Sequence, residues 1–417
     1  MPTPQNTVHE AEDSVPPPRA RPLWRNRDYV LLWSGQFVSS FGSEASFLAF
    51  PLLMLALTHS PAQAGLLGVL RSLPFALLCL PAGALVDRWD RKRVMILCDS
   101  GRAIALGSIP LAYALGHLPL VQLYLVALIE GTLFTFFTLA ETACLPNVVT
   151  KEQLSTAIAQ SQIIDASSLL VGPALSGILY GIGRVVPFLA DTVSYLASVC
   201  SLFFIKGAFQ AERNVEPRKL RTEILEGIVW LWQQPLLRFL ALLTCGLLTP
   251  CFGYTLILIV LAQDQHASSF TIGLVLAAGG IGNIAGTVIA DPLLRRFGFK
   301  RVITWTSWIW ALTWLPLAFA PNLLLLGIAN AIGYIVVPVY MVAQFSYRLS
   351  LIPDHLLGRV NSVFRLIAFG SRPIGIGLTG LLLQGPGPVV TVLVLFIPQV
   401  LLALAVTVHP QMRASSR

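Results

Sequence analysis

Long apolar stretches recur along this chain, and they constrain its fold more than any other feature. A bilayer core about 30 Å thick needs about 20 mostly apolar residues in each helix that crosses it. Stretches of that length follow one another from Tyr29 almost to the C-terminus, and only 12 % of the 417 residues are charged. The sequence therefore predicts a polytopic membrane protein.

The apolar stretches are expected to be helices rather than strands. Lipid cannot satisfy the hydrogen bonds of an open backbone, and the stretches lack the alternating pattern of barrel strands. We therefore expect an all-α fold with about twelve transmembrane helices. The expected spans are 30–57, 63–86, 94–115, 119–144, 154–181, 186–206, 236–262, 269–292, 302–320, 322–347, 358–383 and 388–408.

Positively charged residues between the expected spans gather on one side of the membrane. Clusters of arginine and lysine precede the first span and follow the second, sixth and eighth spans, whereas the connections on the other side hold only Arg184. The positive-inside rule then predicts a multi-pass protein of a plasma (inner) membrane with both termini in the cytoplasm. The net charge of +8 sets topology and contacts anionic lipids, so it does not indicate a nucleic-acid partner.

The two halves of the chain look like a duplication. "DRWDRKRV" at 87–94 and "RRFGFKRV" at 295–302 each follow the second span of six, and they share residues at four matching positions. Such repeats indicate two pseudo-symmetric six-helix bundles with a binding site between them near the midplane. The expected domains are a disordered cytoplasmic arm 1–28, an N-terminal half 29–208, a cytoplasmic central loop 209–235, a C-terminal half 236–409 and a cytoplasmic tail 410–417.

The six-plus-six plan together with "GALVDRWDRKRV" at 83–94 resembles the major facilitator superfamily. More narrowly, this segment with "GPALSGIL" and "GRVNSVFRLIAFGSRPIGIGLTGLL" resembles the bacterial branch of enterobactin exporters and macrolide-efflux proteins. The resemblance implies secondary active export of an amphipathic drug, antibiotic or siderophore by proton antiport, with the proton gradient as energy source and no cofactor. A lysophospholipid or other lipid transporter, or a small-molecule importer of the same superfamily, remains the alternative.

Two motifs are candidates for the transport cycle. The resemblance implies a cytoplasmic gating switch in which Asp87 pairs across the two halves, while a purely topological role of the basic loop is the other interpretation. An antiporter-like motif in the fifth span is similarly open to interpretation as small packing residues with a kink. The gating candidates are Gly83, Asp87, Arg88, Arg91, Lys92 and Arg93, and the antiporter-like candidates are Gly172, Pro173 and Gly177.

Charged residues within the spans point to function, because each buried ion is costly in a membrane. In the superfamily spans 1, 2, 4, 5, 7, 8, 10 and 11 line the cavity, and we expect the outer spans to hold one clear intramembrane charge, Asp191. Glu130 is the leading candidate for proton coupling; alternatively it is a structural ion paired with Arg71 or Arg372, or it recognises substrate. The full set of coupling or cavity charges is Glu130, Glu44, Arg71, Glu141, Asp165, Arg365 and Arg372.

Other classes of protein are not indicated. The chain has no phosphate-binding G-x-x-x-x-G-K-[ST] pattern, no H-E-x-x-H and no G-x-S-x-G, so neither an ATPase nor another enzyme is expected, and no metal site is predicted. The expected partners are a small-molecule substrate and membrane lipids, with the chain acting as a monomer. Candidate cavity-wall residues, for which packing is the alternative role, are Gln36, Phe134, Phe137, Tyr254, Tyr340 and Gln344.

Overall fold

The structure is a computed structural model that describes residues 22–150, 152–206, 209, 220–353 and 356–413. Helices make up nearly all of this part of the chain, and no strand occurs in it. Most of the expected N-terminal arm, ten residues of the central loop and the last four residues of the tail lie outside the described residues. The first half contains η1 (Leu23–Arg25), α1 (Arg27–Thr58), α2 (Pro61–Val86), α3 (Arg91–Ala114), α4 (Leu120–Val148), α5 (Leu154–Ile182) and α6 (Val186–Phe204).

The second half contains helices that are more often broken. They are α7 (Leu220–Gln233), α8 (Pro235–Cys251), α9 (Tyr254–Asp264), α10 (Ser269–Leu312), α11 (Trp314–Ala318), α12 (Leu323–Leu351), α13 (Leu357–Gly370), α14 (Arg372–Gln384), α15 (Pro388–Val408) and α16 (Pro410–Arg413). Helix α7 lies in the segment that the sequence suggested was a polar central loop. The all-α prediction is confirmed. The segment expected to be a central loop contains a helix, α7, that the sequence analysis did not predict.

Helix ends follow local sequence signals. The Ser60 side chain accepts a hydrogen bond from the Gln63 amide and Pro61 opens α2, which is a favoured start for a helix. Asp90 does the same for α3 by accepting from the Arg93 amide. One acid of the "DRWDRKRV" loop therefore caps a helix.

Two of the expected spans are joined in α10. Eleven segments of the described chain are long and apolar enough to cross a membrane, and one of them, Ser269–Ala318, holds two passes. The helix reverses at Gly298, whose φ of 74° is unfavourable for residues with a side chain. Counting both passes gives the twelve crossings expected from the sequence.

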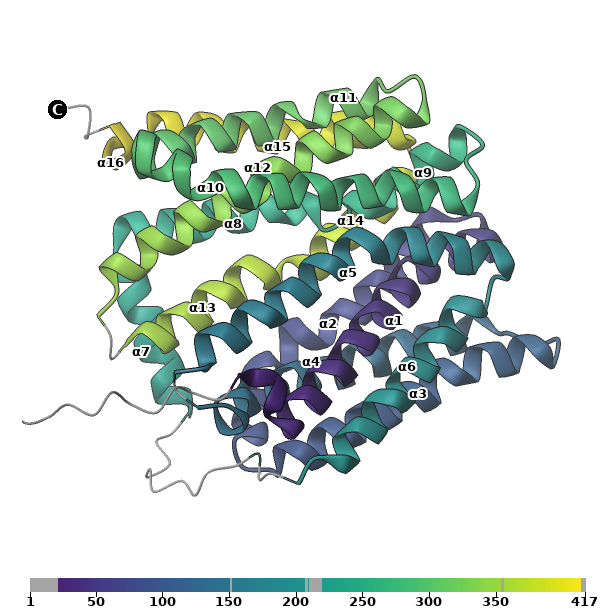
Figure 1. Cartoon of the computed structure of the whole chain (residues 1–417). Helices are drawn as coiled ribbons and strands as arrows, with labels where there is room; N and C mark the ends of the chain where they lie inside the picture. The colour runs from purple at the N-terminus through teal and green to yellow at the C-terminus, as the bar shows by residue number, and fades with distance from the viewer. Residues whose placement is uncertain (1–21, 151, 207–208, 210–219, 354–355, 414–417) are drawn as a thin grey trace, which may run out of the picture.

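The helices form two groups (Figure 1). Within the N-terminal half α1 packs on α6 and α2 on α4, and within the C-terminal half α10 packs on α12. The halves meet where α5 packs on α10 and where α2 packs on α14. We call these two contacts the seam. The term "terminal end" denotes the end of the bundle that contains the start of α1 and the last residues of α15, and the term "distal end" denotes the opposite end.

The seam is tightest towards the distal end, where glycines bring backbones together. A Cβ on Gly65 of α2 would lie 2.9 Å from the Gly380 Cα of α14, and one on Gly177 of α5 would lie 2.5 Å from the Ser269 carbonyl oxygen. The Ser60 hydroxyl adds a hydrogen bond of 2.6 Å to the Gln384 side chain. Near the terminal end of α2, by contrast, a Cβ on Gly83 would meet no atom within 4 Å. The two halves are therefore locked together at the distal end.

Candidate functional site

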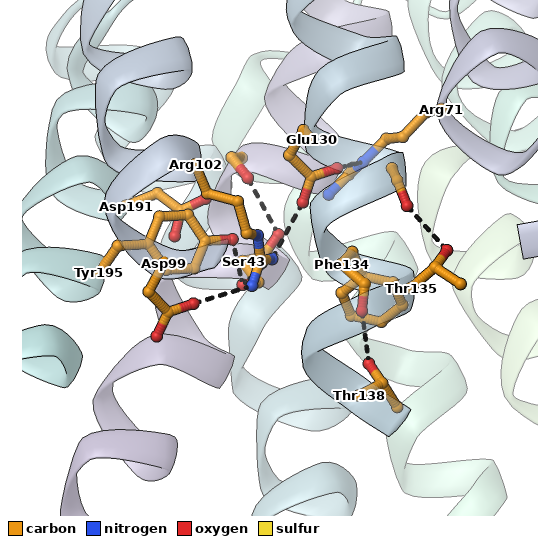
Figure 2. A network of polar contacts seen from close by, with 12 residues as sticks. Ser43, Arg71, Asp99, Arg102, Glu130, Phe134, Thr135, Thr138, Asp191 and Tyr195 are labelled. Carbon is orange, nitrogen blue, oxygen red and sulfur yellow. Dashed lines mark hydrogen bonds and ion pairs between the residues drawn. The ribbon is translucent and has the colours of Figure 1, made fainter. Parts of the chain in front are cut away.

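A network of charged side chains lies inside the N-terminal half (Figure 2). Glu130 of α4 is at its centre and is 1 % exposed. One carboxylate oxygen accepts from the Arg71 Nε at 2.5 Å, and the other accepts from an Arg102 terminal nitrogen at 3.0 Å. Glu130 therefore bridges α2 and α3 as a carboxylate shared by two guanidinium groups.

Arg102 of α3 joins four helices around this centre, since it also donates a 3.4 Å hydrogen bond to the Ser43 hydroxyl of α1. Its guanidinium group also donates to Asp99 at 3.4 Å and lies 4.0 Å from the ring centre of Tyr195 in α6. Asp99 in turn accepts a hydrogen bond of 2.6 Å from the Ser198 hydroxyl. The network ties α2, α3, α4 and α6 into one unit by charge-assisted hydrogen bonds.

Asp99 and Arg102 were missed by the sequence analysis, and the expectation that Asp191 is the one clear charge of the outer spans is wrong. Asp99 and Arg102 lie in α3, are at most 1 % exposed and belong to the expected span 94–115, which is one of the outer spans. Their spacing of three residues, which places two side chains on one helix face, was the signal available in the sequence. Asp191 is also fully buried, and its Oδ1 accepts from the Ser194 hydroxyl at 3.0 Å.

Glu130 has the kind of pairing that the alternative interpretation described, but with different partners. Arg71 is one of the two candidates named for it, whereas the second partner is Arg102 rather than Arg372. Glu44, another of the candidate charges, has no hydrogen bond or ion pair among the described residues. This arrangement favours a structural ion at Glu130.

Glu44 lies close to the seam. The Cβ of Glu44 packs so closely that a side chain on Gly172 of α5 would lie 2.5 Å from it. The charged groups close enough to interact electrostatically with the Glu44 carboxyl are Arg71 of α2, Arg372 of α14 and Asp165 of α5. Glu44 thus faces one arginine from each half of the protein.

The aromatic ring of Phe47 marks the same place. Its centre lies 5.1 Å from the Arg71 guanidinium and 5.8 Å from that of Arg372. Such distances allow attraction between a cation and a ring face. Phe47 of the N-terminal half therefore contacts cations of both halves.

The candidate gating motif is held mainly by its own half. Arg91 lies 3.4 Å from Asp87 and donates to the Ala143 carbonyl at 2.7 Å, while Lys92 donates to the Ile205 carbonyl at 2.6 Å. Arg88 is exposed, and Arg93 pairs with Asp90 on the surface. The two inward cations satisfy carbonyls at the ends of α4 and α6, as positive side chains near helix C-termini generally do.

The antiporter-like residues lie at the seam and against α1. The Pro173 carbonyl oxygen would be 2.4 Å from a Cβ on Gly273 of α10, and Gly177 faces Ser269 of the same helix. Ser176 donates a 2.6 Å hydrogen bond to the Ala45 carbonyl of α1. Small residues in this motif therefore permit close packing of α5 on both halves.

Two of the expected cavity-wall residues lie in the interior of a half instead. Phe137 is 2 % exposed among buried side chains of α3, α4 and α6. Tyr340 is fully buried, hydrogen-bonds with Thr244 at 2.8 Å and contacts Trp310, all within the C-terminal half. Packing is therefore the better explanation for both.

The remaining candidates are spread over both halves. Phe134 is 42 % exposed and lies 5.4 Å from Arg102. Tyr254 is buried against Trp314 and Tyr334. Gln344 is buried, Gln36 and Glu141 are partly exposed, and Asp165 and Arg365 are exposed.

Comparison with solved structures identifies the fold. The chain superposes on an inward-facing bacterial homologue of the iron transporter ferroportin with a TM-score of 0.73, at 17 % identity over 91 % of this chain and 98 % of the other. The outward-facing state of that homologue gives 0.61, at 18 % identity and the same coverage. The chain is also 30 % identical to the uncharacterised MFS-type transporter YfiS of Bacillus subtilis over 74 % of this chain and 71 % of that protein, and it is a major facilitator superfamily transporter.

Sequence comparison narrows this class to one family. Residues 20–415 match the family described as transmembrane secretion effector, and the chain belongs to that family. It is 25 % identical to the multidrug efflux pump Tap of Mycolicibacterium fortuitum over 92 % of this chain and 96 % of the pump. It is 28 % identical to macrolide efflux protein A of Streptococcus pyogenes over 86 % of this chain and 89 % of that protein.

Proposed function

We propose that this protein is a secondary active transporter that exports an amphipathic small molecule from the cytoplasm by alternating access. The observation that carries the proposal is the seam, where the two halves pack closely together at the distal end of the bundle. Support for export comes from the relatives, one named a multidrug efflux pump and another a macrolide efflux protein. The substrate comes from the cytoplasmic side or the inner leaflet.

The conformation corresponds to the inward-facing state of this cycle. The basic loops are at the terminal end, so we assign this end to the cytoplasm of a bacterial cell by the positive-inside rule. The glycine contacts then close the outer side. The higher TM-score to the inward-facing than to the outward-facing ferroportin homologue agrees with this assignment.

Proton exchange is the proposed energy source, and Glu44 is the better candidate to carry the proton. Glu130 is held by two guanidinium groups within one half, so its counter-ions stay with it when the halves move. Glu44 instead faces Arg71 and Arg372 from opposite halves. Protonation of Glu44 would remove its attraction to these two cations, so proton binding would change the electrostatic interaction between the halves.

The "DRWDRKRV" loop is the proposed gate on the cytoplasmic side. The unfilled space at Gly83 agrees with a helix surface that receives a partner only when this side closes. Asp87 would then pair with a cation or a helix N-terminus of the other half. Asp87→Asn is expected to slow transport, and full transport by this variant would contradict the gating role.

The proposed function is tested in proteoliposomes with an imposed pH gradient, an interior pH dye and a panel of macrolides, other lipophilic drugs and catecholate siderophores. Substrate-triggered proton movement in the wild type, lost in Glu44→Gln, would support antiport through Glu44. Loss in Glu130→Gln with coupling intact in Glu44→Gln would return the role to Glu130. Labelled lysophospholipid forms a separate arm, and its transport in the absence of any drug-coupled proton movement would favour the lipid transporter.

A further inference from the structure

Charge is divided unequally between the membrane segments of the two halves. Away from the helix ends, the N-terminal half holds six carboxylates in its helices, Glu44, Asp99, Glu130, Glu141, Asp165 and Asp191, against two arginines that pair within the network, Arg71 and Arg102. In the C-terminal half, the described acids from Pro235 to Val408 are Asp264 and Asp291, and both lie at a helix end or near a helix turn. The inner helices α12, α13 and α14 carry Arg348, Arg365 and Arg372. The wall that the C-terminal half contributes is therefore cationic.

Two of these arginines have buried donors with no acceptor in the described structure. Arg348 is 4 % exposed, and its Nε and one terminal nitrogen lack a hydrogen-bond partner. The same holds for the Nε of Arg372 and for the side-chain amide nitrogen of Gln344, one turn before Arg348. Buried donors of this kind are costly unless something accepts from them.

Aromatic rings surround the same cations. The Arg348 guanidinium lies 4.0 Å from the ring centre of Phe364, and that of Arg372 lies 5.8 Å from the ring centres of both Phe47 and Phe252. A ring face attracts a cation without supplying the acceptor that its N–H groups need. A ligand with both an aromatic or aliphatic body and an anionic group would satisfy both requirements.

The cations follow one path from the terminal end to the seam. Arg365 is exposed on α13, within electrostatic range of Arg348 in its own half and of Cys79 on α2 in the other half. Arg372 follows Arg365 by seven residues, about two helical turns. Since α13 and α14 both contact α2, this path runs along the contact between the halves.

Membrane topology explains only part of this pattern. Arg348 lies in the last turn of α12, where a cation is favoured by the helix dipole and by the positive-inside rule. Arg372 lies at the start of a helix, where neither explanation applies. Unpaired arginines inside a membrane protein are expensive and generally mark a ligand path.

We infer that the transported molecule is an amphipathic anion whose carboxylate or phosphate group binds Arg365 and Arg372, with Arg348 adding positive potential behind them. This inference rests on the proposed function and specifies its substrate class. Guanidinium groups bind both anions through paired N–H donors. The excess of carboxylates in the opposite half repels the anionic group and so orients the molecule.

The test uses three probes that share one fluorophore and differ in charge. Dansylglycine carries a carboxylate, dansylglycinamide is neutral and dansylcadaverine is cationic. Binding is measured by fluorescence on the full chain in phosphatidylcholine nanodiscs, with empty nanodiscs as the background. We expect dansylglycine to bind at least tenfold more tightly than the other two probes.

Substitutions assign this preference to the arginines. Arg365→Gln and Arg372→Gln should each weaken dansylglycine binding at least tenfold, and Arg365→Lys should retain part of it. Arg296→Gln removes an exposed arginine of the same half, which stacks on Phe297, and should change binding less than twofold. Thermal unfolding of each variant verifies that the protein is folded; a misfolded glutamine variant is replaced by its methionine counterpart.

Further measurements show whether the bound anionic group belongs to a substrate or to a lipid. They also distinguish failure of the anion-site inference from failure of the proposed transport function. Phosphatidylglycerol that displaces dansylglycine from the wild type, together with no transport of dansylglycine, would identify a resident lipid phosphate and overturn the substrate assignment. Equal affinity for all three probes, or unchanged binding in the Arg365→Gln/Arg372→Gln double variant, would overturn the anion site itself. Arginine-dependent binding without transport of any compound would leave the anion site standing and contradict the proposed exporter.

Discussion

Glu130→Gln is the substitution whose effect follows most directly from the structure. The glutamine keeps the size of the side chain but removes the charge that two guanidinium groups share. Removal of one partner from a buried ion pair typically costs about 3–5 kcal/mol. Arg102 retains Asp99 at 3.4 Å and the Arg71 side chain is 15 % exposed, so we expect a value near the lower limit.

A loss of about 3 kcal/mol changes the folding equilibrium by roughly 150-fold. In a half of this size it would lower the unfolding midpoint by about 6–12 °C. The measurement is thermal unfolding of the purified protein in detergent, followed by tryptophan fluorescence.

Glu141→Gln provides the matched control for this substitution. Glu141 is also a carboxyl group of α4, but the described structure gives it no ion pair. We expect it to unfold within about 1 kcal/mol of the wild type, the usual range for sites without such a partner. In a Glu130→Gln/Arg71→Met double variant, removal of the orphaned cation should recover part of the loss. Equal midpoints for Glu130→Gln and Glu141→Gln would refute the interpretation of Glu130 as the structural centre of the network.

Three further predictions concern helix packing and the attachment of α7. Gly131→Ala should lower the unfolding midpoint, because its Cβ would lie 1.9 Å from the Arg71 carbonyl oxygen, whereas Gly83→Ala has free space and should not; equal shifts would contradict this packing. Gly65→Val should separate α2 from α14 at the distal end, measured as a longer distance between spin labels at positions 62 and 381, and an unchanged distance would exclude the proposed closure. Glu226→Gln should loosen α7 by removing its ion pair with Arg359, which faster proteolysis between α6 and α8 would report and an unchanged rate would contradict.

Chain crossings were predictable because the bilayer imposes a length on every apolar helix. The expected span 388–408 coincides with α15, and the other spans differ from the helices mainly at their ends and breaks. The reversal at Gly298 lies in the connection expected between the spans 269–292 and 302–320, although its positive φ leaves no mark in hydropathy. Helix α7 was missed because its segment is more polar than the spans.

The contacts between charged side chains were harder to predict from the sequence than the positions of the helices. The Arg102 partner Glu130 is 28 residues away on another helix, and no pattern along one helix reports such a contact. Phe134 and Phe137 are one turn apart in α4, yet Phe134 is exposed and Phe137 is buried in the interior of the N-terminal half. Which face of a helix meets its neighbour depends on the packing of the whole half, so cavity residues could not be assigned from one sequence.

The glycine contacts at the distal end have a consequence for how the two halves separate. The N-terminal half is internally joined by ion pairs, but the distal contact of α2 with α14 depends on the fit of Gly65 against Gly380 and on neutral hydrogen bonds from Ser60 and Ala62 to Gln384. Dissolved salt weakens attraction between exposed charges and hardly affects contact between uncharged surfaces. The distal end should therefore remain closed to a similar extent in dilute and in saline surroundings, so that a transporter built this way would keep this conformation when the salt concentration of the medium changes.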